Sequence, residues 1–153
     1  MSLFEKISED LKAAMLAKQK DRLESLRAIK TAFLLAKTES ASHDLSPDLE
    51  LKIIQKLVKQ RKESAAIYQT QNRMDLYQKE VDEAAVIEEY LPKQMSESEL
   101  LPLLRDIVAR LGATSPKDMG KVMGTASKEL AGRADGKMIA DKVKELLGGS
   151  QGV

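Results

Sequence analysis

The chain has 153 residues, of which 32% are charged and 42% hydrophobic. A chain of this length buries roughly 68–70% of its unfolded surface, so it can build a core without metal or disulfide support. Its 25 basic and 24 acidic residues nearly cancel, which argues against a basic nucleic-acid arm, a polybasic membrane anchor or an acidic disordered tail. The absence of cysteine excludes disulfide frameworks, cysteine-ligated zinc, iron–sulfur clusters and thiol nucleophiles.

The N-terminal segment does not resemble a secretory signal peptide. Glu5, Glu9 and Asp10 interrupt the region where a signal peptide needs an uninterrupted apolar stretch. No window approaches the roughly 18 apolar residues of a membrane span. We therefore expect a soluble cytoplasmic protein with no membrane partner.

The N-terminal part predicts about four helices, because apolar residues recur there at helical spacing. Nowhere do β-branched residues alternate for long enough to indicate a sheet. Ser46 is expected to cap the third helix, with Pro47 at its first position. We expect these helices at about residues 3–17, 21–41, 47–68 and 73–90.

A domain boundary is predicted at Pro92, which ends the fourth helix. Ser96 and Glu99 then form a capping box for the first of three shorter helices, and a glycine follows each of these helices. We expect the shorter helices at about residues 97–111, 116–131 and 136–147. The sequence thus predicts an all-α protein: an N-terminal helical domain (1–92), a small three-helix C-terminal domain (93–149) and a disordered tail (150–153).

Enzymatic constellations are absent from the sequence. His43 is the only histidine and lies in a polar loop, so one chain cannot assemble a two-histidine metal site or a Ser-His-Asp triad. The segment 132–137 has too few residues between its glycines for a phosphate-binding Walker loop. We expect no catalytic residue, metal or cofactor.

One predicted ion pair concerns the packing of the third and fourth helices. Arg61 projects into the apolar face of the third helix, and Glu80 falls inside the apolar face of the fourth. A charge in such a place needs a partner, so we expect an Arg61–Glu80 ion pair that fixes the register of the two helices. The alternative is that Arg61 faces a groove and receives an anionic ligand.

The helix predicted at 116–131 separates its side chains into two faces. Lys117, Lys121 and Lys128 fall opposite its apolar residues, with Gly120 and Gly124 beside them. Each glycine inside a helix costs about 0.8–1 kcal/mol relative to alanine, so two need a reason. Either a neighbouring helix approaches closely at a notch of small residues, or bare backbone between lysines lets a bulky polyanion approach.

The segment that follows adds two cations, Arg133 and Lys137, around Gly136 at the start of the last helix, whose free N–H groups favour anions. From residue 115 to residue 144 there are seven basic and four acidic residues. The chemistry alone leaves two interpretations open, a solvated helix face or an anion-binding face.

These segments also carry a resemblance to a known family. The pattern at 115–124 and 132–137 is similar to the signature of the GatB/YqeY domain, and the resemblance extends over most of the chain. The further matching blocks are residues 57–64, 72–76 and 89–96. The free-standing YqeY-like proteins are the most similar members, and the same domain ends the B subunit of the glutamyl-/aspartyl-tRNA amidotransferase.

The resemblance implies a tRNA-binding accessory protein of translation without catalysis of its own. From it we expect tRNA as the partner, with an aminoacyl-tRNA synthetase or an amidotransferase as a possible further partner. We expect no binding to DNA. The residues that we expect to contact RNA are Lys117, Gly120, Lys121, Gly124, Lys128, Arg133, Gly136 and Lys137. Two alternatives stay open: a component of glutamine-dependent tRNA amidation that acts with a catalytic partner, and a scaffold that holds a partner helix in an apolar groove between the two domains.

Overall fold

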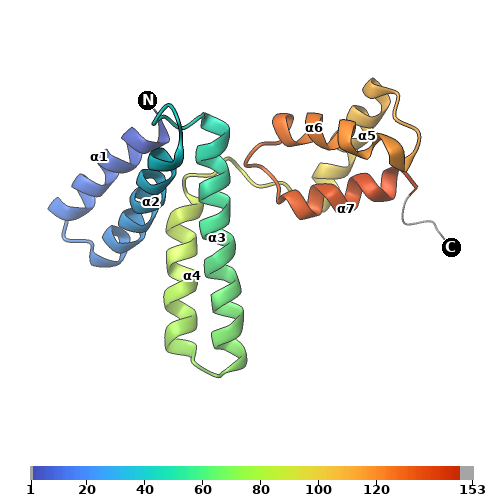
Figure 1. Cartoon of the computed structure of the whole chain (residues 1–153). Helices are drawn as coiled ribbons and strands as arrows, with labels where there is room; N and C mark the ends of the chain where they lie inside the picture. The colour runs from blue at the N-terminus through green and yellow to red at the C-terminus, as the bar shows by residue number, and fades with distance from the viewer. Residues whose placement is uncertain (1, 149–153) are drawn as a thin grey trace. The chain divides into compact units, whose positions relative to one another are not determined.

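The chain is all-α, as predicted. A computed structural model describes residues 2–148, so the predicted tail and Gly149 lie outside the described residues. Within 2–148 there are seven α-helices, one short 3₁₀-helix and no strand. The chain forms two compact units, Met1–Leu91 and Pro92–Val153, and we describe each by itself (Figure 1).

The N-terminal unit contains two helical hairpins. Its helices are α1 (Leu3–Leu16), α2 (Lys20–Glu39), α3 (Pro47–Thr70) and α4 (Met74–Glu88). The long α3 and α4 lie side by side, and a tight turn in which Asn72 has a φ of 58° joins them (Figure 1). Aliphatic side chains and Phe33 fill the core of this unit. The fully buried members are Ile7, Leu26, Ile29, Phe33, Ile54 and Ile87.

The starts of α1 and α3 are held together by a buried carboxylate. Ser46 caps α3 by accepting a hydrogen bond from Leu49 N, as the Ser46–Pro47 pattern predicts. Glu50 lies in the first turn of α3, where negative charge suits the helix dipole, and is only 4% exposed. Its Oε2 accepts a 3.0 Å hydrogen bond from Phe4 N, one of the free N–H groups of α1. Glu50 therefore ties the first hairpin to α3.

The C-terminal unit is a three-helix domain with an aliphatic core. It comprises α5 (Glu97–Leu111), η1 (Pro116–Asp118), α6 (Met119–Glu129) and α7 (Gly136–Leu146). The segment predicted as one helix from residue 116 thus begins with a 3₁₀ turn. The core joins apolar residues of all three α-helices, and its fully buried members are Leu100, Leu104, Val122, Ala126 and Val143.

Turns of the C-terminal unit are fixed by backbone and amide hydrogen bonds. Gly112 ends α5 with a φ of 64°, a conformation that favours glycine. Gln94 Nε2 donates to Gly132 O at 2.6 Å, and Met95 N donates to Arg133 O at 2.9 Å. These two bonds hold the α6–α7 loop against the segment that precedes α5.

None of the helices described in residues 2–148 is both long and apolar enough to cross a membrane.

Candidate nucleic-acid interface

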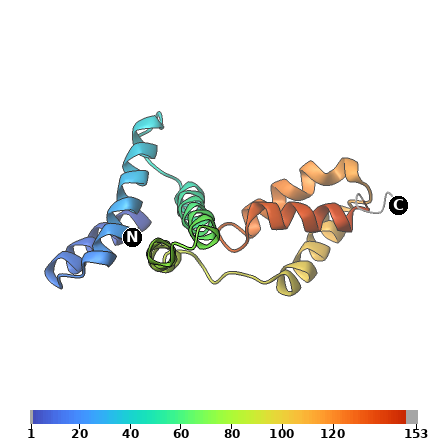
Figure 2. The same ribbon diagram turned by 90° about the horizontal axis from the view of Figure 1, so that it is seen from below.

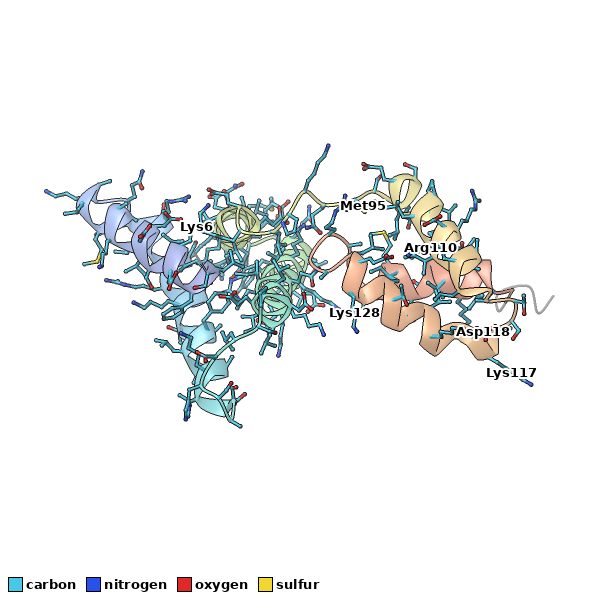
Figure 3. The ribbon with its side chains drawn as sticks, turned by 90° about the horizontal axis from the view of Figure 1, so that it is seen from above. Lys6, Met95, Arg110, Lys117, Asp118 and Lys128 are labelled. Carbon is cyan, nitrogen blue, oxygen red and sulfur yellow. The ribbon has the colours of Figure 1, made fainter. Side chains whose placement is uncertain are left out.

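One face of α6 and its preceding turn presents only lysine and glycine. This lysine–glycine face consists of Lys117, Gly120, Lys121, Gly124 and Lys128, and all five are exposed. Their spacing places them within a strip about 100° wide, because each helical residue turns by about 100°. Figure 3 shows Lys117 and Lys128 at opposite ends of α6, both projecting away from α5. The opposite face of α6 buries Val122 and Ala126 in the core.

The glycines of this face have open space above them. A Cβ atom added at Gly120 or Gly124 would meet no heavy atom within 4 Å. Within the C-terminal unit no neighbouring helix approaches either glycine, which contradicts the notch interpretation for the packing of this unit. The helix cost of about 0.8–1 kcal/mol for each glycine is not offset by packing within the unit. What the glycines provide is bare backbone between lysine side chains.

The acidic residues beside this face are occupied by other partners. Asp118 Oδ2 accepts hydrogen bonds from Thr114 N at 3.0 Å and Ser115 N at 3.4 Å. Glu129 binds Arg110 Nη2 through both carboxylate oxygens, at 2.7 and 2.9 Å, and this hydrogen bonding raises the pKa of Arg110. Arg110 thus neutralises Glu129, and the Asp118 carboxylate faces backbone N–H groups, so neither acid forms an ion pair with a lysine of this face in residues 2–148.

The three lysines of the face differ in what they contact. Lys121 Nζ donates a 3.2 Å hydrogen bond to Leu111 O, one of the free carbonyls at the end of α5. Over residues 2–148, Lys117 and Lys128 make no ion pair and no side-chain hydrogen bond. Lys117 and Lys128 are therefore available to a ligand, whereas Lys121 also fastens α6 to α5.

The α6–α7 loop continues the basic surface from the Lys128 end of α6. Arg133, Gly136 and Lys137 are all exposed there. Asp135 is the N-cap residue of α7, yet its side chain makes no capping hydrogen bond. The first N–H groups of α7 are thus left without a side-chain acceptor, at the end of the helix where the dipole favours negative charge.

Arg133 also acts on a neighbouring capping carboxylate. Glu99 closes the capping box of α5, accepting from Ser96 N at 3.1 Å. Hydrogen bonds from Ser96 lower the pKa of Glu99, and the charges of Lys93 and Arg133 lower it further. Arg133 is thus close to the start of α5.

The sequence matches the family described as "Yqey-like protein" over residues 4–147. The chain belongs to the YqeY-like family. This membership confirms the resemblance found in the sequence, and the match extends across both units.

Curated relatives of this YqeY-like chain come from fungi and share the name "altered inheritance of mitochondria protein 41, mitochondrial". The protein from Pyrenophora tritici-repentis is 28% identical over 146 residues, which cover 94% of this chain and 80% of the relative. The protein from Kluyveromyces lactis is 33% identical over 84 residues (55% of this chain, 45% of the relative). That from Meyerozyma guilliermondii is 36% identical over 86 residues (56% and 44%).

In the N-terminal unit of the YqeY-like chain, Arg61 is paired, but with another residue than predicted. Its Nε lies 3.6 Å from Glu83 Oε2, and both side chains are about one-fifth exposed. The predicted partner, Glu80, is one turn away along α4. Arg61 and Glu83 stand eleven residues before and after Asn72, so two antiparallel helices with equal rise bring them to the same height. Burial raises the pKa of Glu83, and Glu80 adds to this.

The sequence predicted the cations of the site, but it did not predict which groups bind the acidic residues beside them. Arg110 neutralises Glu129 from α5, nineteen residues away in sequence. The sequence does contain a local signal for the hydrogen bonds of Asp118, because Ser115 and Asp118 have the spacing of a capping box and form one at η1. The Arg110–Glu129 pair has no such local signal, because it depends on how α5 packs against α6.

Proposed function

We propose that this YqeY-like protein binds tRNA through the sugar–phosphate backbone, using the C-terminal unit. The observation that carries the proposal is the exposed lysine–glycine face of α6. Lysines bind phosphates as point charges, and bare helix backbone between them allows a bulky polyanion to come close. Arg133, Lys137 and the free N–H groups at the start of α7 extend the same chemistry.

Recognition of backbone and shape suits this unit better than recognition of bases. Residues 92–153 contain no aromatic side chain, so no ring is available to stack on an unpaired base. The chain carries a formal net charge of only +1, and its phosphate-binding surface is local. We therefore expect weak binding that depends strongly on salt, as fits an accessory module rather than an autonomous tRNA binder.

The location of the protein is part of this proposal. A tRNA partner requires a compartment in which translation takes place, and we keep the cytoplasm as the expected location from the sequence. The relatives carry mitochondrial names, and a tRNA-binding role is compatible with either compartment.

The test is a charge reversal at the two lysines that have no other contact. The variant Lys117→Glu/Lys128→Glu should lower the affinity for an unmodified tRNA transcript by about tenfold or more in fluorescence anisotropy at low salt. Lys121 is a poorer choice, because its loss also removes the hydrogen bond to Leu111. Circular dichroism should show unchanged helicity.

A matched control makes the same change of charge in the other unit. Lys12 and Lys59 are exposed and have no ion pair within residues 2–148. The variant Lys12→Glu/Lys59→Glu should keep its tRNA affinity within about twofold, allowing for the longer-range effect of net charge. If both variants lose affinity equally, or neither does, the proposed site is wrong.

A further inference from the structure

A groove in the N-terminal unit is not used by the proposed RNA site. It runs between the C-terminal half of α2 and the N-terminal half of α3, with a volume of about 710 Å³. Figure 2 looks along α3 and shows α2 lengthwise, so the two helices cross obliquely and diverge. Their divergence leaves apolar side chains of both helices uncovered.

The floor and rim of this α2–α3 groove are largely apolar. Leu35 is 60% exposed on α2 and Leu49 is 38% exposed on α3. Ile53 and Leu57 line the groove as half-buried side chains. Single exposed leucines are common on protein surfaces, but here they continue into one hollow surface, which is typical of a binding site.

The residues of each wall repeat at helical spacing. On α3, Leu49, Ile53 and Leu57 stand four residues apart and form one ridge. On α2, Ala32 and Ala36 are small and leave a hollow beside Leu35. A ridge beside a hollow is the surface that accepts the side chains of another helix. From Leu49 to Gln60 the α3 wall extends about 16 Å, which is the length of a three-turn helix.

Charges on the two walls restrict what the occupant can be. Lys52 and Lys56 stand one turn apart on the α3 wall, both exposed, and neither has an ion pair within residues 2–148. Glu39 lies on the α2 wall and is also exposed and unpaired in that range. An apolar floor with a pair of free lysines along one side complements an apolar stripe flanked by acids.

We propose that the α2–α3 groove binds an amphipathic helix of a partner protein. The helix presents apolar residues at positions i, i+3 or i+4, and i+7 to the groove. Two acidic residues one turn apart on its flank pair with Lys52 and Lys56. RNA is a poorer occupant, because the apolar floor offers nothing to phosphates or riboses.

The test uses a synthetic probe and the full chain. The probe is an 18-residue helical peptide with leucine at i, i+4 and i+7, and with glutamates one turn apart on one flank. A control peptide carries lysine in place of each glutamate. We expect the glutamate peptide to shift amide resonances of the ¹⁵N-labelled protein at residues around Leu35, Ile53 and Leu57, and the lysine peptide to leave them unchanged.

Two variants examine the apolar and the charged contacts separately. Leu35→Gln changes an exposed side chain, so the fold should persist while the peptide affinity falls about tenfold or more. Lys52→Glu/Lys56→Glu should lose the glutamate peptide and gain the lysine peptide, because reversing both sides of a charge pair restores complementarity. The RNA-site variant Lys117→Glu/Lys128→Glu should bind the glutamate peptide like the wild type.

Several results would overturn the inference. Equal binding of both peptides, or shifts confined to other parts of the chain, would remove the groove as a selective helix site. Concentration-dependent self-association that Leu35→Gln abolishes would make a second copy of this chain the occupant. Shifts at the groove on addition of tRNA, with none on addition of peptide, would assign the groove to RNA.

Discussion

Tyr90 Oη donates a 2.6 Å hydrogen bond to Asp10 Oδ2 and so joins the end of α4 to α1 across 80 residues of sequence. Tyr90 is only 6% exposed, and burial followed by this bond raises the pKa of its phenol well above the ordinary value. The neighbouring Glu89 binds both Nη atoms of Arg22, at 2.8 and 3.2 Å. Two adjacent residues thus hold the end of α4 on the first hairpin, just before Pro92.

Replacing Tyr90 with phenylalanine should lower the free energy of unfolding by about 1–2 kcal/mol at pH 7, because the charged Asp10 carboxylate loses the hydrogen bond that the phenol donates to it. The effect should depend on pH in a known direction. A raised pKa in the folded state means that the stabilisation is complete below about pH 10, the unfolded phenol value, and is lost as the pH rises above it. Urea unfolding from pH 7 to 11 should show the gap between wild type and Tyr90→Phe closing at high pH. If the difference in unfolding free energy stayed constant up to pH 11, the pKa of Tyr90 would not be raised in the folded state.

The Arg61–Glu83 pair should behave as a coupled, half-buried ion pair. Arg61 Nε is buried and makes no hydrogen bond within the described residues, so removing Glu83 leaves a charge poorly compensated. We expect Arg61→Leu and Glu83→Leu each to cost about 1–2 kcal/mol, and the double variant to be closer to wild type than their sum.

The single and double variants form a double-mutant cycle, and its control is a second cycle with Glu80, the partner predicted from the sequence. Combining Arg61→Leu with Glu80→Leu should give additive effects, with a coupling energy near zero, if Glu83 is the true partner. Denaturant unfolding of the five variants and the wild type measures both cycles. A larger coupling to Glu80 than to Glu83 would restore the original interpretation.

The glycines of the lysine–glycine face allow stability and binding to be separated. Gly120→Ala/Gly124→Ala should raise the free energy of unfolding by about 1–2 kcal/mol, because the added Cβ atoms meet nothing and alanine favours the helix. Gly120→Gln/Gly124→Gln should also be stable, but its longer side chains should weaken tRNA binding several-fold without changing the charge. Equal tRNA affinities of the alanine and glutamine variants would show that RNA does not approach the bare backbone.

Salt dependence measures the number of phosphate contacts. With about five cations on phosphates, a plot of log affinity against log salt should have a slope near −4. Lys117→Glu/Lys128→Glu should reduce the magnitude of this slope by about 2, because two contacts are lost. An unchanged slope with reduced affinity would mean that these lysines act at a distance rather than on phosphates.

Helix positions followed from the sequence because local signals determine them. Ser2, Ser46 and Ser96 each accept a hydrogen bond from the residue three positions on, so three helix starts are set by side chains next to them. The start of α6 was less well predicted, since Pro116 opens a 3₁₀ turn and the α-helix begins only at Met119. Backbone hydrogen bonding over a few residues decided this difference.

The sequence likewise predicted which residue types share one face of the helix at the candidate site. The spacing of Lys117, Lys121 and Lys128 around one helix follows from the helical repeat alone, and so does the placing of the glycines among them. Exposure does not follow, because the same glycines would suit a tight helix contact equally well. Only the packing of the C-terminal unit showed that the space above Gly120 and Gly124 is open.

The sequence contains 25 basic and 24 acidic residues, but this near balance does not show which charges are paired in the folded protein. The sequence by itself determined the helical class, the capped starts of α3 and α5 and the residue types on each helix face, since these depend on neighbours within one or two turns. The tertiary structure decided which charges cancel: Arg61 meets Glu83 rather than Glu80, and Glu129 is taken by Arg110. Such pairings depend on the register between two consecutive helices, which the geometry of the turn and the packing of the core set together.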